Sequence, residues 1–147
     1  MTLAKRLRPA SPSSVIWTEK ARAHTPELVQ RLLVAFSIHM TLLGEAGLRR
    51  LARVNHANAV QLADRLGAIA GVEIVNTHFF NEFTLRTPRP AAELVEALAR
   101  RGVIGGLPAS RLLPGAGLDD CVIVASTETN TDADRAAYAQ ALAECLR

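Results

Sequence analysis

The hydrophobic pattern of this chain changes its period near Gly71, and that change limits the folds open to it. Before Gly71, apolar residues recur every three or four positions from Pro26 to Leu43 and again from Leu48 to Ile69, with Gly44 between the two runs. This spacing predicts two amphipathic helices, the first with Pro26 in its first turn. Gly71 suits the end of the second helix, because glycine adopts a left-handed conformation at little steric cost.

After Gly71 the pattern becomes that of short strands. Two runs rich in aromatic and β-branched residues, 72–75 and 79–87, are separated by a polar turn, so we expect two adjacent strands. Successive side chains of a strand point to opposite faces, so alternate residues of the second run should share one face: Phe79, Asn81, Phe83 and Leu85.

The rest of the chain adds helices and a further buried strand. Pro88 and Pro90 favour a helix up to Arg101, which Gly102 ends. A short strand and an ordered loop over 103–117 precede a buried strand over 121–126. The last helix begins near Thr131 with Asp134 as a capping-box partner, and its expected apolar face is Ala137, Ala141, Leu142 and Cys145. The order of elements predicts an α+β fold, a small sheet with helices packed on one face.

Composition narrows the class of protein. The chain is 49% hydrophobic and 21% charged over 147 residues, which predicts one globular unit. The net charge is only +3, and most of the excess comes from the first 22 positions, where Glu19 is the only acid beside five basic residues: Lys5, Arg6, Arg8, Lys20 and Arg22. The remaining chain is close to neutral, so we expect no nucleic-acid partner. No apolar run approaches the roughly 20 residues of a membrane span, and no signal peptide is recognisable, so we expect a cytoplasmic protein with no membrane partner.

Residues 1–17 are expected to form a disordered leader. Cys121 and Cys145 are expected to be buried free thiols.

Motifs for chemistry are few. The four histidines, His24, His39, His56 and His78, show no spacing typical of metal ligands. The glycines at 102, 105 and 106 fit no phosphate-binding fingerprint and are better explained by a tight connection between a helix and a strand. No histidine is placed in the sequence so as to suggest a nucleophilic triad with Ser110 or Cys121. The only lysines, Lys5 and Lys20, lie near the N-terminus, where neither is a credible anchor for a Schiff base.

Several stretches in fixed order carry a resemblance to a known family: 41–44 (TLLG) with Gly47-Leu48, 79–83 (FFNEF), 102–106 (GVIGG), and Thr127-Glu128 with Thr131. Together they resemble the C-terminal part of the glycine-cleavage P-protein, specifically the alpha subunit of glycine dehydrogenase (decarboxylating). The resemblance covers about residues 18–147.

The resemblance implies a fold-type-I pyridoxal phosphate architecture. Residues 18–70 would be a helical segment from the end of the large domain, and residues 71–147 the small C-terminal domain. The family decarboxylates glycine and passes the aminomethyl group to the lipoyl arm of the H-protein, so the implied partners are the H-protein and the other P-protein subunit or large domain. In two-subunit versions the cofactor lysine resides in the beta subunit. This chain alone is therefore expected to bind no cofactor and to be inactive.

One arginine is a candidate for substrate binding. Arg111 follows the double-glycine loop, and in related folds an arginine of the small domain often binds the substrate carboxylate, because its planar fork matches that group. The alternative is a solvated loop arginine. The family motifs also supply Asn81, Glu82, Gly105 and Gly106, to which no role is assigned.

The chain departs from the family after Glu19-Lys20-Ala21. Where the family has a small polar segment near its active site, this sequence reads Arg22-Ala23-His24-Thr25-Pro26. This departure favours one alternative to an enzyme fragment, a non-functional remnant. The very apolar first helix, Leu28 to Leu43, favours another, a non-catalytic binding or assembly module. Sequencing the neighbouring DNA would identify a remnant by an upstream large domain in another reading frame.

Overall fold

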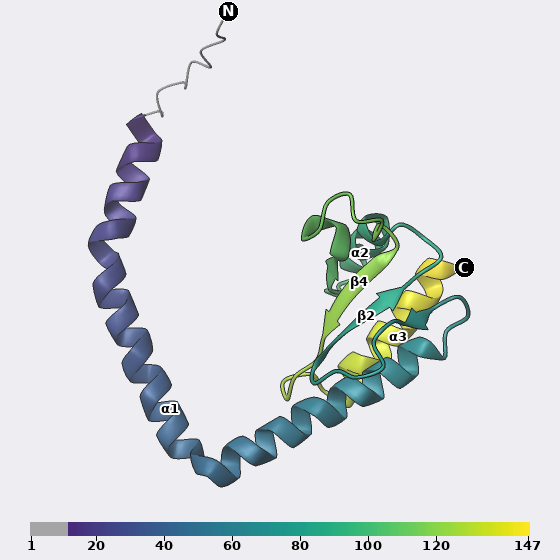
Figure 1. Cartoon of the computed structure of the whole chain (residues 1–147), viewed down its shortest axis with the longest axis horizontal. Helices are drawn as coiled ribbons and strands as arrows, with labels where there is room; N and C mark the ends of the chain where they lie inside the picture. The colour runs from purple at the N-terminus through teal and green to yellow at the C-terminus, as the bar shows by residue number, and fades with distance from the viewer. Residues whose placement is uncertain (1–11) are drawn as a thin grey trace, which may run out of the picture. The chain divides into compact units, whose positions relative to one another are not determined.

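A computed structural model describes residues 12–147, with side chains from residue 26 onward (Figure 1). The elements follow one another as α1 (Pro12–Gly67), β1 (Glu73–Ile74), β2 (Glu82–Arg86), α2 (Ala91–Arg100), β3 (Leu107–Pro108), a short 3₁₀ turn η1 (Ala109–Arg111), β4 (Cys121–Ala125) and α3 (Asp132–Leu146). The chain divides into two compact units, Met1–Leu48 and Arg49–Arg147.

Helix α1 contains both helices expected from the apolar repeats. The break between them lies at Gly44, whose φ of 58° and ψ of −175° are not helical and belong to a region that is essentially restricted to glycine. The helix begins at Pro12 rather than at the predicted Pro26, so residues 12–17 of the expected leader are helical and residues 1–11 lie outside the described part. Proline is tolerated at a helix start because its missing N–H would have no partner there.

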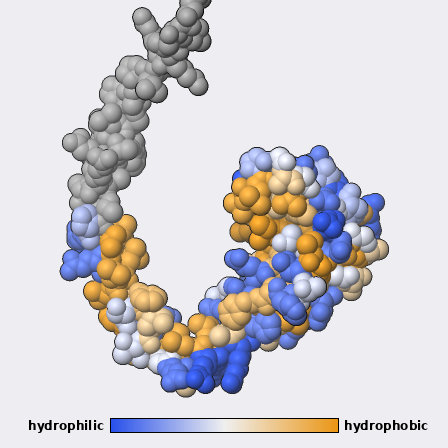
Figure 2. Space-filling view, viewed as in Figure 1, coloured by the Kyte–Doolittle hydropathy of each residue, from blue (hydrophilic) through white to orange (hydrophobic). Residues whose placement is uncertain are grey.

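The first unit exposes the apolar side chains of its helix. Figure 2 shows apolar residues gathered along this part of α1. The large ones between 28 and 42 are each 46–81% exposed: Leu28, Val29, Leu32, Leu33, Val34, Phe36, Ile38 and Leu42. By length and composition alone, Pro26–Gly67 would also suffice to cross a membrane, although one such helix near an N-terminus is weak evidence for a membrane protein.

The second unit is built on an antiparallel sheet in the order β1-β2-β4-β3. Strands β2 and β4 run side by side in opposite directions at its centre, with Phe83 opposite Val124 and Leu85 opposite Val122 (Figure 1). All pairings are antiparallel. The sheet with its helices confirms the predicted α+β class.

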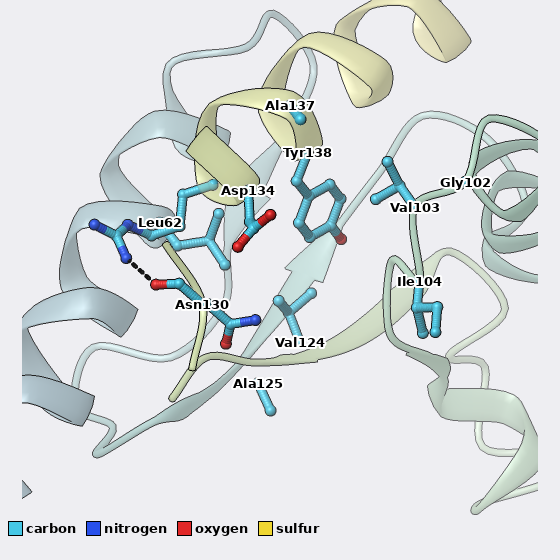
Figure 3. Close-up of a pocket in the computed structure, with 11 residues that line it drawn as sticks. Leu62, Gly102, Val103, Ile104, Val124, Ala125, Asn130, Asp134, Ala137 and Tyr138 are labelled. Atoms are coloured by element: carbon cyan, nitrogen blue, oxygen red, sulfur yellow. Dashed lines mark hydrogen bonds between the residues drawn. The ribbon is translucent and has the colours of Figure 1, made fainter. Parts of the chain in front are cut away.

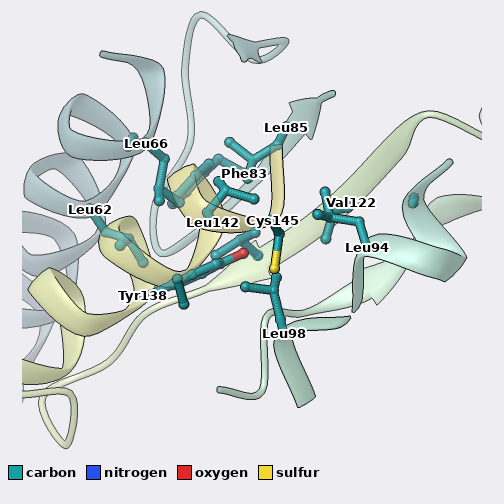
Figure 4. Packing of buried hydrophobic residues seen from close by; sticks show 14 of the residues in the cluster. Leu62, Leu66, Phe83, Leu85, Leu94, Leu98, Val122, Tyr138, Leu142 and Cys145 are labelled. Carbon is teal, nitrogen blue, oxygen red and sulfur yellow. The ribbon is translucent and has the colours of Figure 1, made fainter. Parts of the chain in front are cut away.

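The core of the second unit lies between one face of this sheet and three helices (Figure 4). The sheet contributes Phe83, Leu85, Val122 and Val124, each at most 2% exposed. The helices contribute Leu62 and Leu66 from α1, Leu94 and Leu98 from α2, and Tyr138, Leu142 and Cys145 from α3. Burying one large apolar side chain stabilises a fold by about 1.5–3 kcal/mol, so this cluster holds the unit together.

Details of the sheet and of α3 differ from the sequence expectations. Strand β2 begins at Glu82 rather than at Phe79, because residues 79–81 form irregular backbone and bends rather than an extended strand. On α3, Ala137 is exposed and Tyr138 is buried in its place, since Tyr138 shares a helical face with Leu142 and Cys145. Both cysteines are buried and free, as predicted.

The predicted domain boundary at residue 70 does not coincide with the boundary between the compact units. Residues 49–67 of α1 belong to the second unit, where Leu62 and Leu66 are part of the sheet-facing core. The apolar stripe of a helix shows that one face is buried, but it does not show against which element.

Candidate functional site

Three of the family motifs, which are far apart in the sequence, meet around strand β4: 79–83, 102–106 and the segment from Thr127. The motif over 41–48 lies in the first compact unit. Glu82 pairs with Ala125, and the carbonyl of Asn81 accepts a hydrogen bond of 2.9 Å from the N–H of Ser126. Thr127 follows directly, and its carbonyl accepts a 2.9 Å hydrogen bond from the side-chain amide of Asn58 on α1. The end of β4 is therefore where the helix, the aromatic segment and the Thr127 turn are joined.

The double-glycine loop packs against the same strand. A Cβ at Gly106 would lie 2.3 Å from the carbonyl oxygen of Ile123, and Gly106 has a φ of 118°. A Cβ at Gly105 would lie 2.4 Å from Leu98 of α2. Both glycines thus allow a close approach of backbone to its neighbours, which agrees with the predicted tight connection between a helix and a strand.

A hollow of about 290 Å³ lies beside this loop (Figure 3). Its walls come from α1, the loop 102–104, the end of β4 and the first turns of α3, and its polar side chains are Asn130, Asp134, Arg135 and Tyr138. This hollow lies beside the double-glycine motif. Whether it could hold a ligand depends on which of its polar side chains are free to form hydrogen bonds.

Most of these polar groups are already engaged within the fold. Asp134 closes the capping box of α3: its carboxylate accepts from the N–H of Thr131 at 2.8 Å and from the Thr131 hydroxyl at 2.7 Å. These hydrogen bonds hold the pKa of Asp134 below its ordinary value. The Tyr138 hydroxyl donates to the carbonyl of Gly105, and burial raises the pKa of Tyr138 far above its usual range, so the phenol is a neutral donor.

Arg135 is the most unusual group at the hollow, because its side chain is only 7% exposed. Its guanidinium donates to the carbonyl of Asn130 at 2.6 Å and to the side chain of Gln61 at 3.1 Å, while its Nε has no partner. The charge fixes the turn before α3 to α1. Among the described residues that line the hollow, none pairs a nucleophile with a base.

The structure does not bring the predicted substrate arginine to this hollow. Arg111 ends η1, is exposed, and is not among the residues that line the cavity. Arg111 forms no hydrogen bond or ion pair with another described residue. Its guanidinium is therefore available to a ligand outside the hollow, and the geometry leaves both alternatives, substrate binding and solvation, open.

Sequence reasoning missed the two buried polar side chains of α3. Arg135 carries a charge and was not expected inside, but it occupies the turn after a capping box, where backbone carbonyls are within reach. Tyr138 could have been found, because Tyr138, Ala141, Leu142 and Cys145 follow the spacing of a single helical face.

The side chains that the structure describes do not suit pyridoxal phosphate. This cofactor needs a lysine for its Schiff base, and residues 26–147 contain none. Lys5 and Lys20 lie outside the described side chains. Within the same described part, no group of three or more His, Cys, Asp or Glu side chains is placed to hold a metal ion.

Comparison with known proteins identifies the family. The chain is 69% identical over 109 residues to the probable glycine dehydrogenase (decarboxylating) subunit 1 of Methylocella silvestris, which covers 74% of this chain. It is 68% identical over 114 residues to the protein of the same name from Parvibaculum lavamentivorans, which covers 77%. The chain belongs to the glycine dehydrogenase subunit 1 family. It spans about a quarter of the length of these curated relatives, 24% and 25% respectively.

The fold comparison agrees with this assignment. The crystal structure of an inhibitor-bound glycine decarboxylase, the P-protein of the glycine cleavage system, matches 74% of this chain and 24% of its own chain with a TM-score of 0.67 and 32% identity. No family model matches the chain. The α+β lobe is thus a partial counterpart of the glycine dehydrogenase fold.

Proposed function

We propose that this chain serves glycine decarboxylation as a part of glycine dehydrogenase and is inactive on its own. The observation that carries the proposal is the 69% identity to a quarter of a glycine dehydrogenase subunit, combined with residues 26–147 that contain no lysine. The missing catalytic groups, the cofactor pyridoxal phosphate and the amine that anchors it would come from the remainder of the enzyme. The aminomethyl group would pass to the lipoyl H-protein.

An exchange assay tests this function. The purified chain, supplied with glycine, pyridoxal phosphate, H-protein and labelled bicarbonate, should incorporate no label into glycine. Addition of the other P-protein subunit together with the missing three quarters of a subunit 1, taken from Methylocella silvestris, should restore exchange. Turnover by the chain alone would contradict the proposal, as would a failure of the complete mixture when an intact enzyme is active under the same conditions.

Arg111 is our candidate for the residue that binds the glycine carboxylate in such an assembly. It is exposed, it has no ion-pair partner among the described residues, and its fork of N–H donors matches a carboxylate. In the active mixture, Arg111→Gln should raise KM about tenfold or more, because a charged hydrogen bond is lost. Arg100→Gln, at the exposed end of α2, is the matched control and should leave KM unchanged.

The exposed apolar helix favours a second candidate, a non-catalytic assembly module. Eight large apolar side chains between 28 and 42 face solvent, and patches of this kind mark interaction surfaces. We propose the absent large domain of a P-protein subunit as the partner. Size-exclusion chromatography with light scattering should show a complex with that domain, lost in Leu32→Asp and kept in Gln30→Asp. A strictly monomeric, folded chain in that mixture would count against this candidate.

A further inference from the structure

A second hollow, separate from the glycine loop, lies where α1 meets the segment before β2. Two cavities of about 540 and 440 Å³ share His56, His78 and Phe79 as walls. Arg53 and Phe80 also line the first cavity, and Asp64 lines the second. All these residues belong to the second compact unit. The hollow therefore combines aromatic faces with nitrogen donors.

The ring of His56 is held in one tautomer by the backbone. Its Nδ1 lies 2.9 Å from the carbonyl oxygen of Phe80, and a carbonyl oxygen can only accept. The proton of the neutral ring therefore sits on Nδ1, and Nε2 carries a lone pair that can accept a hydrogen bond. The same hydrogen bond ties the segment before β2 to α1.

The aromatic rings of Phe79 and Phe80 lie beside the ring of His56. The rings of His56 and Phe80 are parallel within 3° with centroids 6.2 Å apart, and the Phe79 ring lies 6.4 Å away at 60°. Phe80 keeps 54% of its surface exposed, although a large aromatic side chain is costly to leave in water. A planar ring can stack on this face.

Arg53 gives the hollow its charge preference. It precedes His56 by three residues on α1, so the two side chains share one face of the helix. Arg53 is exposed, and the described residues offer it no hydrogen-bond or ion-pair partner. Its N–H fork suits a carboxylate or phosphate. Asp64 lines the second cavity, where its charge disfavours an anion.

We propose that the Arg53–His56–Phe80 hollow binds a planar aromatic anion, with the ring against Phe80 and the anionic group on the guanidinium of Arg53. No contact in the hollow depends on the catalytic assembly proposed above. The anion site and the proposed role in glycine decarboxylation are therefore tested independently. A carboxylate and a phosphate present the same acceptor chemistry to Arg53, and the experiment distinguishes them.

Isotope-labelled full-length chain is titrated with benzoate and with phenyl phosphate while the NMR signals of His56 and Phe80 are followed. At least one probe should produce saturable shifts at both residues, and the tighter probe identifies the preferred anion. Arg53→Gln should weaken that binding about tenfold, because a charge-assisted hydrogen bond is lost. Phe80→Ala should weaken it severalfold through lost stacking.

The controls separate a built anion site from a general apolar surface. Arg50→Gln, on the same helix but outside the hollow, should bind as the unchanged chain does, and circular dichroism checks that each variant keeps its helices. Acetate, which lacks a ring, should bind at least tenfold more weakly than benzoate. The proposal is overturned if neutral benzyl alcohol binds as tightly as the anions, if Arg53→Gln behaves like Arg50→Gln, or if neither probe saturates.

Discussion

Helix α1 contains two stretches of similar composition with different surroundings. In the stretch before Gly44, Leu32 is 60% exposed, whereas in the stretch after it Leu66 is completely buried in the sheet-facing core. Both stretches show the same three- and four-residue apolar spacing. The comparison teaches that an amphipathic pattern specifies a helix and the width of its apolar face, while the presence of a partner for that face depends on the rest of the fold.

Leu66→Ala is the variant for which this comparison predicts the largest loss of stability. Removal of a fully buried leucine side chain leaves a cavity between α1 and the sheet, and we expect the free energy of unfolding of the second unit to fall by about 2–5 kcal/mol. Urea unfolding followed by circular dichroism measures it. A loss below about 1 kcal/mol would show that residues 49–67 are not part of the stable core.

Next in size is Gly106→Ala. A methyl group there would meet the Ile123 carbonyl oxygen at 2.3 Å and sit at a φ of 118°, so we expect a loss of about 3 kcal/mol. Gly115→Ala is the matched control, since its φ is 76° but no atom lies within 4 Å, and it should cost about 1 kcal/mol. Equal losses in the two variants would mean that the loop does not press against β4.

Tyr138→Phe removes the hydroxyl that satisfies the Gly105 carbonyl, and we expect about 1–2 kcal/mol of destabilisation. Tyr138 is the single tyrosine of the chain, so its ionisation is visible by ultraviolet absorbance. Because burial raises its pKa in the folded state, the unfolded chain loses this proton first, and stability should fall as the pH rises above 10. Tyr138→Phe should abolish that part of the alkaline loss. Tyrosinate absorbance that appears near pH 10 in the folded chain would contradict the burial.

Thr131→Ala probes the start of α3. The capping box is lost, and we expect about 1 kcal/mol of destabilisation in a urea titration at neutral pH. The pKa of Asp134 is depressed by its bonds to Thr131, so the cap stabilises α3 above the ordinary carboxyl pKa of 3.8 and fades as the pH falls through the folded value. The variant should therefore lose stability less steeply in acid. An unchanged acid profile would show that the box does not form.

The smallest expected effect on stability belongs to Leu32→Ala. The side chain is 60% exposed, so the free energy of unfolding should change by less than about 0.5 kcal/mol. The same change should weaken binding to a large-domain partner in the light-scattering experiment. A loss of stability comparable to that of Leu66→Ala would remove the distinction between the two stretches of α1.

Much of the second unit could be predicted from local patterns. The capping box at Thr131 and Asp134 forms as expected, Gly102 ends α2 with a φ of 77°, and Phe83 and Leu85 face the core together. These features depend on backbone conformation and on periods of two or 3.6 residues, which neighbouring residues determine. The same local logic failed at residues 79–81, where aromatic residues suggested an extended strand. The structure has irregular backbone and bends there, and Phe80 is hydrogen-bonded to His56.

The candidate sites were less predictable, because they join residues distant in sequence. No spacing rule connects Arg135 with Gln61, or Arg53 with Phe80, since these pairs are brought together only when α1 packs beside the sheet. Arg111 illustrates the converse. A motif next to a glycine loop suggested a binding arginine, yet the fold leaves it exposed and apart from the nearby hollow.

The sequence by itself determined the kinds of element, their order, the glycines that end them and the resemblance to glycine dehydrogenase, since each of these depends on residue types at short separations. Only the tertiary structure decided that three of the family motifs meet at β4, that Gly105 and Gly106 lie against neighbouring elements, and that Arg135 is buried. The physical reason is that burial and hydrogen-bond partnership are properties of contacts between distant segments, and those contacts exist only in the packed chain.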